Sequence, residues 1–140
     1  MNAPLKYVTN FRELEVYQRQ RTLAKEVFAF SKRFPKEELY GLASQLRRAV
    51  VSVPSNIAEG QSRSGSRDFL RYLAIARGSL SEVEKQLMIA ERLGYMREER
   101  LFGLLQTAYE VGSLIHGLSV AIGKRLDSQP PLATRHSPPQ

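Results

Sequence analysis

Apolar residues recur along this chain every three or four positions, and almost no segment alternates apolar and polar residues with a period of two. This spacing puts apolar side chains on one face of an α-helix. The first such pattern predicts a helix over residues 12–33. Pro35 ends it, because proline cannot donate the next backbone hydrogen bond. Its apolar positions are Val16, Leu23, Val27, Phe30 and Phe34.

A second helix is predicted over residues 36–60. Pro54 lies within it, but the apolar spacing keeps its phase across the proline. One helix with a kink at Pro54 is therefore expected rather than two helices. The apolar positions are Leu39, Leu42, Leu46, Ala49, Val53 and Ile57.

Two further helices follow a turn over residues 60–66 that is rich in glycine and serine. Ser66 is the expected N-cap of the third helix, with Asp68 in its first turn, and Gly94 is the expected C-terminal glycine. The apolar positions of the third helix are Phe69, Leu73, Ala76, Leu80, Val83, Leu87 and Ala90. Those of the fourth helix are Leu101, Leu104, Ala108, Val111, Ile115, Leu118 and Ile122.

Four long helices joined by short connections predict an all-α fold, an antiparallel up-down-up-down four-helix bundle over residues 11–126. Residues 1–10 are expected to be a flexible N-terminus, and residues 127–140 a disordered, proline-rich tail. Several apolar residues lie outside a single stripe on each helix, which indicates assembly with further subunits. They are Tyr17, Phe28, Leu70, Tyr72 and Ile75.

Composition argues against an enzyme. The 140 residues include no cysteine and two histidines, which excludes disulfides, thiolate catalysis and multi-histidine metal sites. No Glu-x-x-His pair and no phosphate-binding glycine motif is present. His116 is expected at a solvent edge of the fourth helix rather than in catalysis. We therefore expect no enzymatic activity, no cofactor and no metal.

Charge and the chain ends favour a cytoplasmic protein that binds polyanions. The formal net charge is +7 and the pI is about 10, a balance that attracts nucleic acid. The N-terminal residues show no signal-peptide pattern. The longest apolar stretch, residues 108–123, is interrupted by Glu110 and His116 and is too short to span a bilayer. No membrane association is expected.

The strongest candidate for phosphate binding is the connection between the second and third helices. Arginines beside a helix N-terminus provide charge and free backbone N–H groups. The alternative is that Asp68 and other acidic neighbours neutralise these arginines. Further basic candidates lie on the first and second predicted helices. Lys32 lies on the same side of the first helix as its candidates. The candidate residues are Arg63, Arg67 and Arg71; Arg21 and Lys25; and Arg47 and Arg48.

Other polar residues of the second and third helices have simpler interpretations. Asn56 and Glu59 are expected to form a structural network beside the third helix. Glu82 and Glu84 are two residues apart and face different directions, so they cannot act as a carboxylate pair. Solvated or interhelical salt-bridge roles are expected for them.

Several blocks, in this order and spacing, resemble the four-helix bundle family named after proteins encoded in intervening sequences of bacterial 23S rRNA genes. The most specific are Gln-Leu-Arg-Arg at 45–48 and Ser-Asn-Ile-Ala-Glu-Gly at 55–60, and the resemblance covers about residues 11–122. The other blocks span residues 11–18, 34–38, 40–49, 53–60, 71–80 and 93–95.

The resemblance implies a cytosolic bundle that assembles into a ring of five subunits. A relative of this family is the accessory variability protein of diversity-generating retroelements, a basic pentamer that binds nucleic acid and a reverse transcriptase. By that likeness the chain is a non-enzymatic homopentamer that binds structured RNA or DNA through backbone phosphates. The alternative is a protein–protein scaffold or adaptor whose partner is a reverse transcriptase or another protein.

Overall fold

A computed structural model describes residues 11–127 of the chain, and this part is a four-helix bundle. The predicted flexible N-terminus and the proline-rich tail after Asp127 lie outside the described residues. Asp127 itself, expected in the tail, is the last helical residue. The elements are α1 (Phe11–Ser31), the short 3-10 helix η2 (Lys36–Glu38), α2 (Leu42–Ser62), α3 (Ser66–Arg92) and α4 (Glu98–Asp127).

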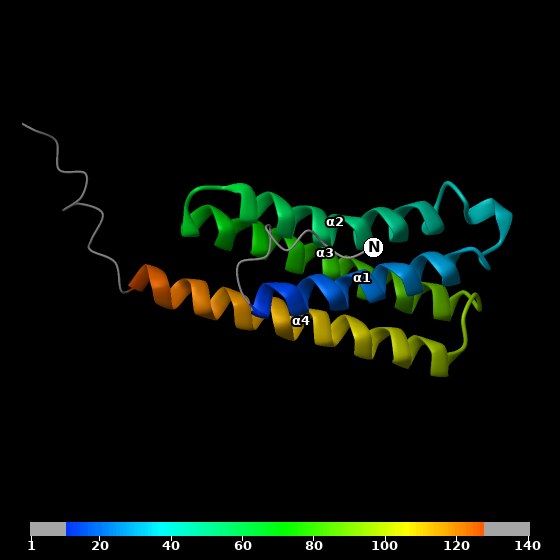
Figure 1. Cartoon of the computed structure of the whole chain (residues 1–140). Helices are drawn as coiled ribbons and strands as arrows, with labels where there is room; N and C mark the ends of the chain where they lie inside the picture. The colour runs from blue at the N-terminus through cyan, green and yellow to red at the C-terminus, as the bar shows by residue number, and fades with distance from the viewer. Residues whose placement is uncertain (1–10, 128–140) are drawn as a thin grey trace, which may run out of the picture.

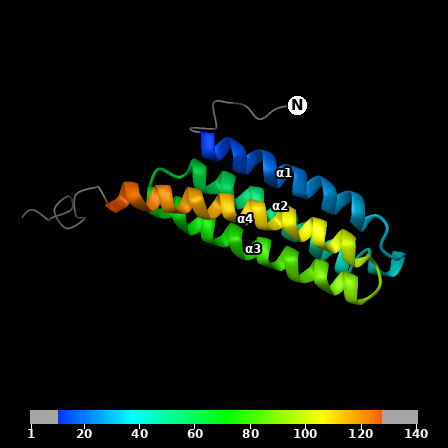
Figure 2. The same cartoon turned by 90° about the horizontal axis from the view of Figure 1, so that it is seen from below.

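The four helices run alternately up and down, as predicted. The α1–α2 and α3–α4 connections lie at one end of the bundle, and the α2–α3 connection lies at the other (Figure 1). Each helix packs against two neighbours, so that α1 contacts α2 and α4, and α3 contacts the same two helices (Figure 2). Helices α1 and α3 are therefore diagonal partners across the core.

The predicted apolar stripes form that core. Nearly every position that the periodicity assigned to the interior is buried, which confirms the spacing argument. Pro54 lies inside α2, as expected, and the bend at this residue stays a prediction. The exceptions are Leu42 and Phe69, which are half-buried against the core, and Leu39, whose side chain is 47% exposed.

Leu39 is exposed because the second helix starts later than predicted. Residues Lys36–Glu38 form η2, and α2 begins only at Leu42. The Glu38 side chain explains the new start, since its Oε1 accepts a hydrogen bond from the Leu42 backbone N–H at 3.2 Å. A carboxylate in this position satisfies one of the N–H groups that the first turn of a helix leaves unpaired.

The sequence predicted the C-terminal end of α3 correctly but not its N-cap. The N-cap is Gly65 and not Ser66, and it makes no side-chain hydrogen bond. At the other end Gly94 has φ +82°, as expected of a C-terminal glycine. The Tyr95 N–H bonds to the Ala90 carbonyl at 2.9 Å, and the Gly94 N–H bonds to the Glu91 carbonyl at 3.0 Å. These two bonds are the Schellman pattern, which turns the chain towards α4.

Tyr95 then joins the two connections at this end of the bundle. Its hydroxyl donates to Glu38 Oε2 at 2.7 Å, and its ring lies 5.5 Å from the ring of Phe34. The bond from Tyr95, with the backbone bond from Leu42, lowers the pKa of Glu38 below its ordinary value of 4.5. The same bond raises the pKa of Tyr95.

The Glu38–Tyr95 bond is expected to make stability depend on acid pH. A carboxyl whose pKa is lower in the folded state stabilises the fold above its unfolded pKa, and this contribution disappears as pH falls through the folded value. Tyr95→Phe keeps the ring but removes the bond. The urea midpoint of wild type should exceed that of Tyr95→Phe at pH 7, and the difference should shrink below pH 4.5. A difference that is independent of pH would contradict this role.

Candidate nucleic-acid interface

Arg63 and Arg71, two of the predicted phosphate ligands, meet at one tyrosine where α2 turns into α3. Their guanidinium carbons lie 5.2 Å and 4.6 Å from the centroid of the Tyr72 ring. Arg63 also donates a hydrogen bond to the Tyr72 hydroxyl at 2.8 Å. Cation–π contacts of this kind hold guanidinium groups in place without neutralising them. Tyr72 is therefore part of the site, although the sequence argument treated it only as surplus apolar surface.

Acidic neighbours partly balance this pair, as the alternative interpretation expected. Glu59 accepts a hydrogen bond from Arg63 at 2.8 Å, and Asp68 lies 3.9 Å from Arg71. Tyr72 and then Glu59 raise the pKa of Arg63, so its guanidinium stays charged. Glu59 thus pairs with an arginine of the site. It was expected instead to belong to a structural network with Asn56.

Arg67 has no side-chain partner among the described residues and is exposed in the first turn of α3. The Gly65 carbonyl accepts a hydrogen bond from the Phe69 N–H at 3.1 Å, but Gly65 has no side chain that could accept one from the N–H groups before Phe69 in α3. A helix start of this kind attracts anions. We define Arg63, Arg67 and Arg71 as the end cluster.

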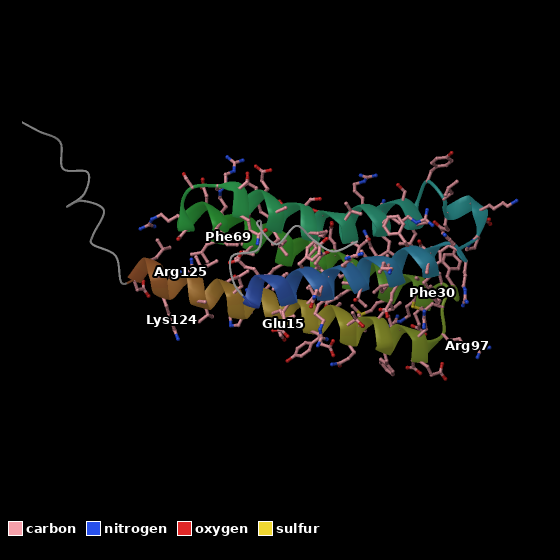
Figure 3. The ribbon with its side chains drawn as sticks, viewed as in Figure 1. Glu15, Phe30, Phe69, Arg97, Lys124 and Arg125 are labelled. Atoms are coloured by element: carbon pink, nitrogen blue, oxygen red, sulfur yellow. The ribbon has the colours of Figure 1, made fainter. Side chains whose placement is uncertain are left out.

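Two basic residues that the sequence argument did not select lie at the same end of the bundle. Lys124 and Arg125 are in the last turn of α4, and Figure 3 shows them at the same end of the bundle as Phe69, which lies near the start of α3. Lysine and arginine are favoured there because they complement the negative end of the helix dipole. The sequence could have indicated these two residues, because both lie in the last turn of the predicted fourth helix.

The remaining predicted residues occupy a long side of the bundle. Arg21, Lys25 and Phe28 are spaced by three or four residues and share one face of α1, and Lys32 follows in the turn directly after this helix. The guanidinium of Arg47, on α2, lies 5.4 Å from the centroid of the Phe28 ring. This places the α1 stripe along the α1–α2 boundary.

Arg47 and Arg48 differ in their surroundings. Arg47 Nε donates to the buried Ser31 hydroxyl at 2.7 Å, so this arginine ties α2 to α1. Arg48 is exposed and has no partner among the described residues. We call Arg21, Lys25, Lys32 and Arg47, together with Arg48 about 100° further round α2, the basic face. None of the ion pairs in the described part of the chain involves the basic face.

The structure thus separates the predicted residues into two groups. Arg63, the C-cap of α2, follows Arg47 by sixteen residues, which corresponds to about 24 Å at 1.5 Å per residue. The end cluster lies at the α2–α3 turn, whereas the basic face runs beside α1. A nucleic acid that contacts both must extend along the molecule.

The polar residues between α2 and α3 are structural. The Asn56 side chain donates to the Ser52 carbonyl at 2.8 Å, and the Ser52 and Ser79 hydroxyls are 2.8 Å apart. This agrees with the expected role of Asn56. Glu84, by contrast, forms no interhelical ion pair among the described residues, and lines a groove with His116.

The described residues show neither a metal-binding cluster nor a membrane-spanning helix. They contain no group of three or more histidine, aspartate or glutamate side chains that could hold a metal ion. None of the helices described here has a stretch long and apolar enough to cross a bilayer.

Comparison with known proteins identifies the family. The family model of the 23S rRNA-intervening sequence protein matches residues 12–117, which is most of the bundle. The chain belongs to this family. A crystal structure of a protein of unknown function from the S23 ribosomal protein family of Bacteroides thetaiotaomicron has the same fold, with a TM-score of 0.72 at 21% identity. The match covers 78% of this chain and 98% of that one. No relative is found among curated proteins.

Proposed function

We propose that this member of the 23S rRNA-intervening sequence protein family is a cytoplasmic, non-enzymatic homo-oligomer, a pentameric ring, that binds structured RNA or DNA through phosphates. The observation that carries the proposal is the basic face, five cationic residues that form no ion pair with any described residue. The end cluster supports it with two guanidinium groups held on Tyr72. Contacts with phosphates position a nucleic acid without reading its sequence.

Exposed apolar side chains support assembly into an oligomer. Phe102, on α4, is 60% exposed, and Ile75 and Ile89, on one side of α3, are 42% and 48% exposed. Large exposed apolar residues that follow a helix face are typical of surfaces that meet another subunit. Multi-angle light scattering measures the number of subunits directly, and a monomer would contradict this part of the proposal.

Salt dependence distinguishes binding to phosphates from the scaffold alternative. Fluorescence anisotropy with labelled duplex DNA and structured RNA should show binding that weakens steeply with salt, because each phosphate contact contributes about 0.7–0.9 to the logarithmic slope. Replacing Arg21, Lys25 and Lys32 by glutamine should remove about 2–3 units of slope if all three contact phosphates. The same test applied to Arg63, Arg67 and Arg71 measures the end cluster.

A triple variant of equal charge provides the control. Lys85, Arg92 and Arg97 are exposed on other parts of the bundle, and their replacement by glutamine should leave most of the slope intact. Equal losses in all three variants would indicate a response to net charge and not a binding face. If wild type binds neither nucleic acid at low salt, the protein is better explained as a scaffold for a protein such as a reverse transcriptase.

A further inference from the structure

A groove of about 380 Å³ lies between α3 and α4, on residues that neither the end cluster nor the basic face includes. Its polar lining comes from Arg77, Ser81 and Glu84 of α3 and from Tyr109, Ser113 and His116 of α4. Small-molecule sites in proteins occupy roughly 300–1,000 Å³, so the groove is large enough for one small ligand.

Within residues 11–127, the charged and aromatic side chains of this groove have no hydrogen-bond or ion-pair partner. Arg77, Glu84, Tyr109 and His116 make no side-chain hydrogen bond and no ion pair with any described residue. Partial burial raises the pKa of Glu84. Hydrogen-bonding capacity in the groove is therefore available to a ligand.

The antiparallel packing sorts these groups to opposite ends. A Cβ at Gly112 would lie 3.3 Å from Leu80 Cδ2, so these two positions mark where α3 and α4 meet. On one side of these two positions lie Arg77 and His116, towards one end of the groove. On the other side lie Glu84 and Tyr109, towards the opposite end. Arg77 and Glu84 are seven residues apart on α3, as are Tyr109 and His116 on α4. Seven residues correspond to a rise of about 10 Å along a helix. One end of the groove is thus cationic, and the other carries a carboxylate and an aromatic ring.

We infer that this groove binds a single nucleotide, with its phosphate between Arg77 and His116 and its base against Tyr109 and Glu84. Guanidinium and imidazole N–H groups donate to phosphate oxygens, and an exposed tyrosine ring stacks on a base. The two carboxylate oxygens of Glu84 accept hydrogen bonds, which favours guanine because its N1 and N2 atoms present adjacent N–H donors.

The separation of the two ends selects this ligand class. The α-ammonium and α-carboxylate groups of a free amino acid are bonded to the same carbon, so these two charges cannot contact both ends of the groove. An inorganic phosphate uses only the cationic end. A nucleotide places an anion and a hydrogen-bonding ring at opposite ends of one molecule, with a ribose between them that faces Ser81 and Ser113. This inference is independent of the proposed function, since it uses no residue of the basic face or the end cluster.

Isothermal titration of the full chain with GMP tests the inference. We expect a dissociation constant of about 1 mM or tighter, and binding of guanosine or inorganic phosphate at least tenfold weaker than that of GMP. Arg77→Gln and Glu84→Gln should each weaken GMP binding at least tenfold. The matched controls, Lys85→Gln and Glu82→Gln, change the same charges on exposed positions of α3 outside the groove and should stay within twofold of wild type.

A parallel titration with a 5′-phosphorylated guanine trinucleotide identifies the source of the nucleotide. Binding of the trinucleotide with the same dependence on Arg77 and Glu84 supports a site for one unit of an RNA strand, whereas binding of GMP alone supports a site for a free nucleotide. Absence of GMP binding overturns the inference, as does equal binding of inorganic phosphate and GMP. Equal effects of the groove variants and their controls overturn it as well.

Discussion

Leu87→Ala is expected to lower the free energy of unfolding by about 3–4 kcal/mol. Leu87 is fully buried, with 0% of its surface exposed, on the face of α3 that closes the core. Truncation removes the transfer free energy of the lost methyl groups and leaves a cavity between helices that cannot fully collapse. Urea denaturation followed by circular dichroism, at one fixed protein concentration, measures the change.

The same substitution on the surface provides the control. Leu93, at the C-terminal end of the same helix, is 52% exposed, so Leu93→Ala should cost about 1 kcal/mol or less. If both variants lost the same stability, Leu87 would not belong to the core, and the assignment of the buried face of α3 would be wrong.

Gly60→Ala should destabilise the bundle by about 1–3 kcal/mol, although alanine is the better helix former. Gly60 lies inside α2, where it is buried. A Cβ there would lie 2.9 Å from Phe69 Cδ1 and 2.9 Å from Tyr72 Cβ, both on α3. Either α3 moves away or the Phe69 ring leaves its position. The glycine therefore allows the close approach of two helices next to the end cluster.

Gly117→Ala is the matched control because the expected sign is opposite. Gly117 lies inside α4, and a Cβ there would have nothing within 4 Å. Alanine should stabilise the helix at this position by up to about 1 kcal/mol. Thermal or urea unfolding of the two variants measures whether each substitution raises or lowers the stability of the bundle. Stabilisation by both substitutions would contradict the close contact at Gly60.

Most of the fold could be predicted because helical periodicity is a local property. The stripes that include Leu73, Leu87, Ile115 and Ile122 are repeated over six or more turns, so a single error of phase does not hide them. The C-terminal glycine Gly94 was predictable for a similar reason, since the left-handed conformation it adopts is costly for other residues.

The errors arose where contacts distant in the sequence decide a local boundary. The periodicity of Leu39 and Leu42 extended the second helix back to residue 36. The carboxylate of Glu38 instead caps α2 at Leu42 while it accepts the hydroxyl of Tyr95, 57 residues later. No pattern in residues 36–42 contains that partner. Gly60 is a similar case, because its neighbours Phe69 and Tyr72 belong to the next helix.

The candidate sites show the same division. Basic residues could be selected by type and spacing, and Arg67, Arg48 and Lys25 are indeed exposed without a partner among the described residues. Their actual neighbours could not be selected in this way. Arg47 is engaged by Ser31 of another helix, and Arg63 is shared between Glu59 and Tyr72.

The amino-acid sequence alone determined the number of helices, their buried faces, the basic charge and the resemblance to the family, because each depends on residue types at short, regular spacing. Only the tertiary structure decided which arginines are free, why Gly60 is glycine, and that Arg77 and Glu84 share a groove with Tyr109 and His116. Those properties depend on which faces of different helices meet, and side-chain packing across the whole bundle sets that register.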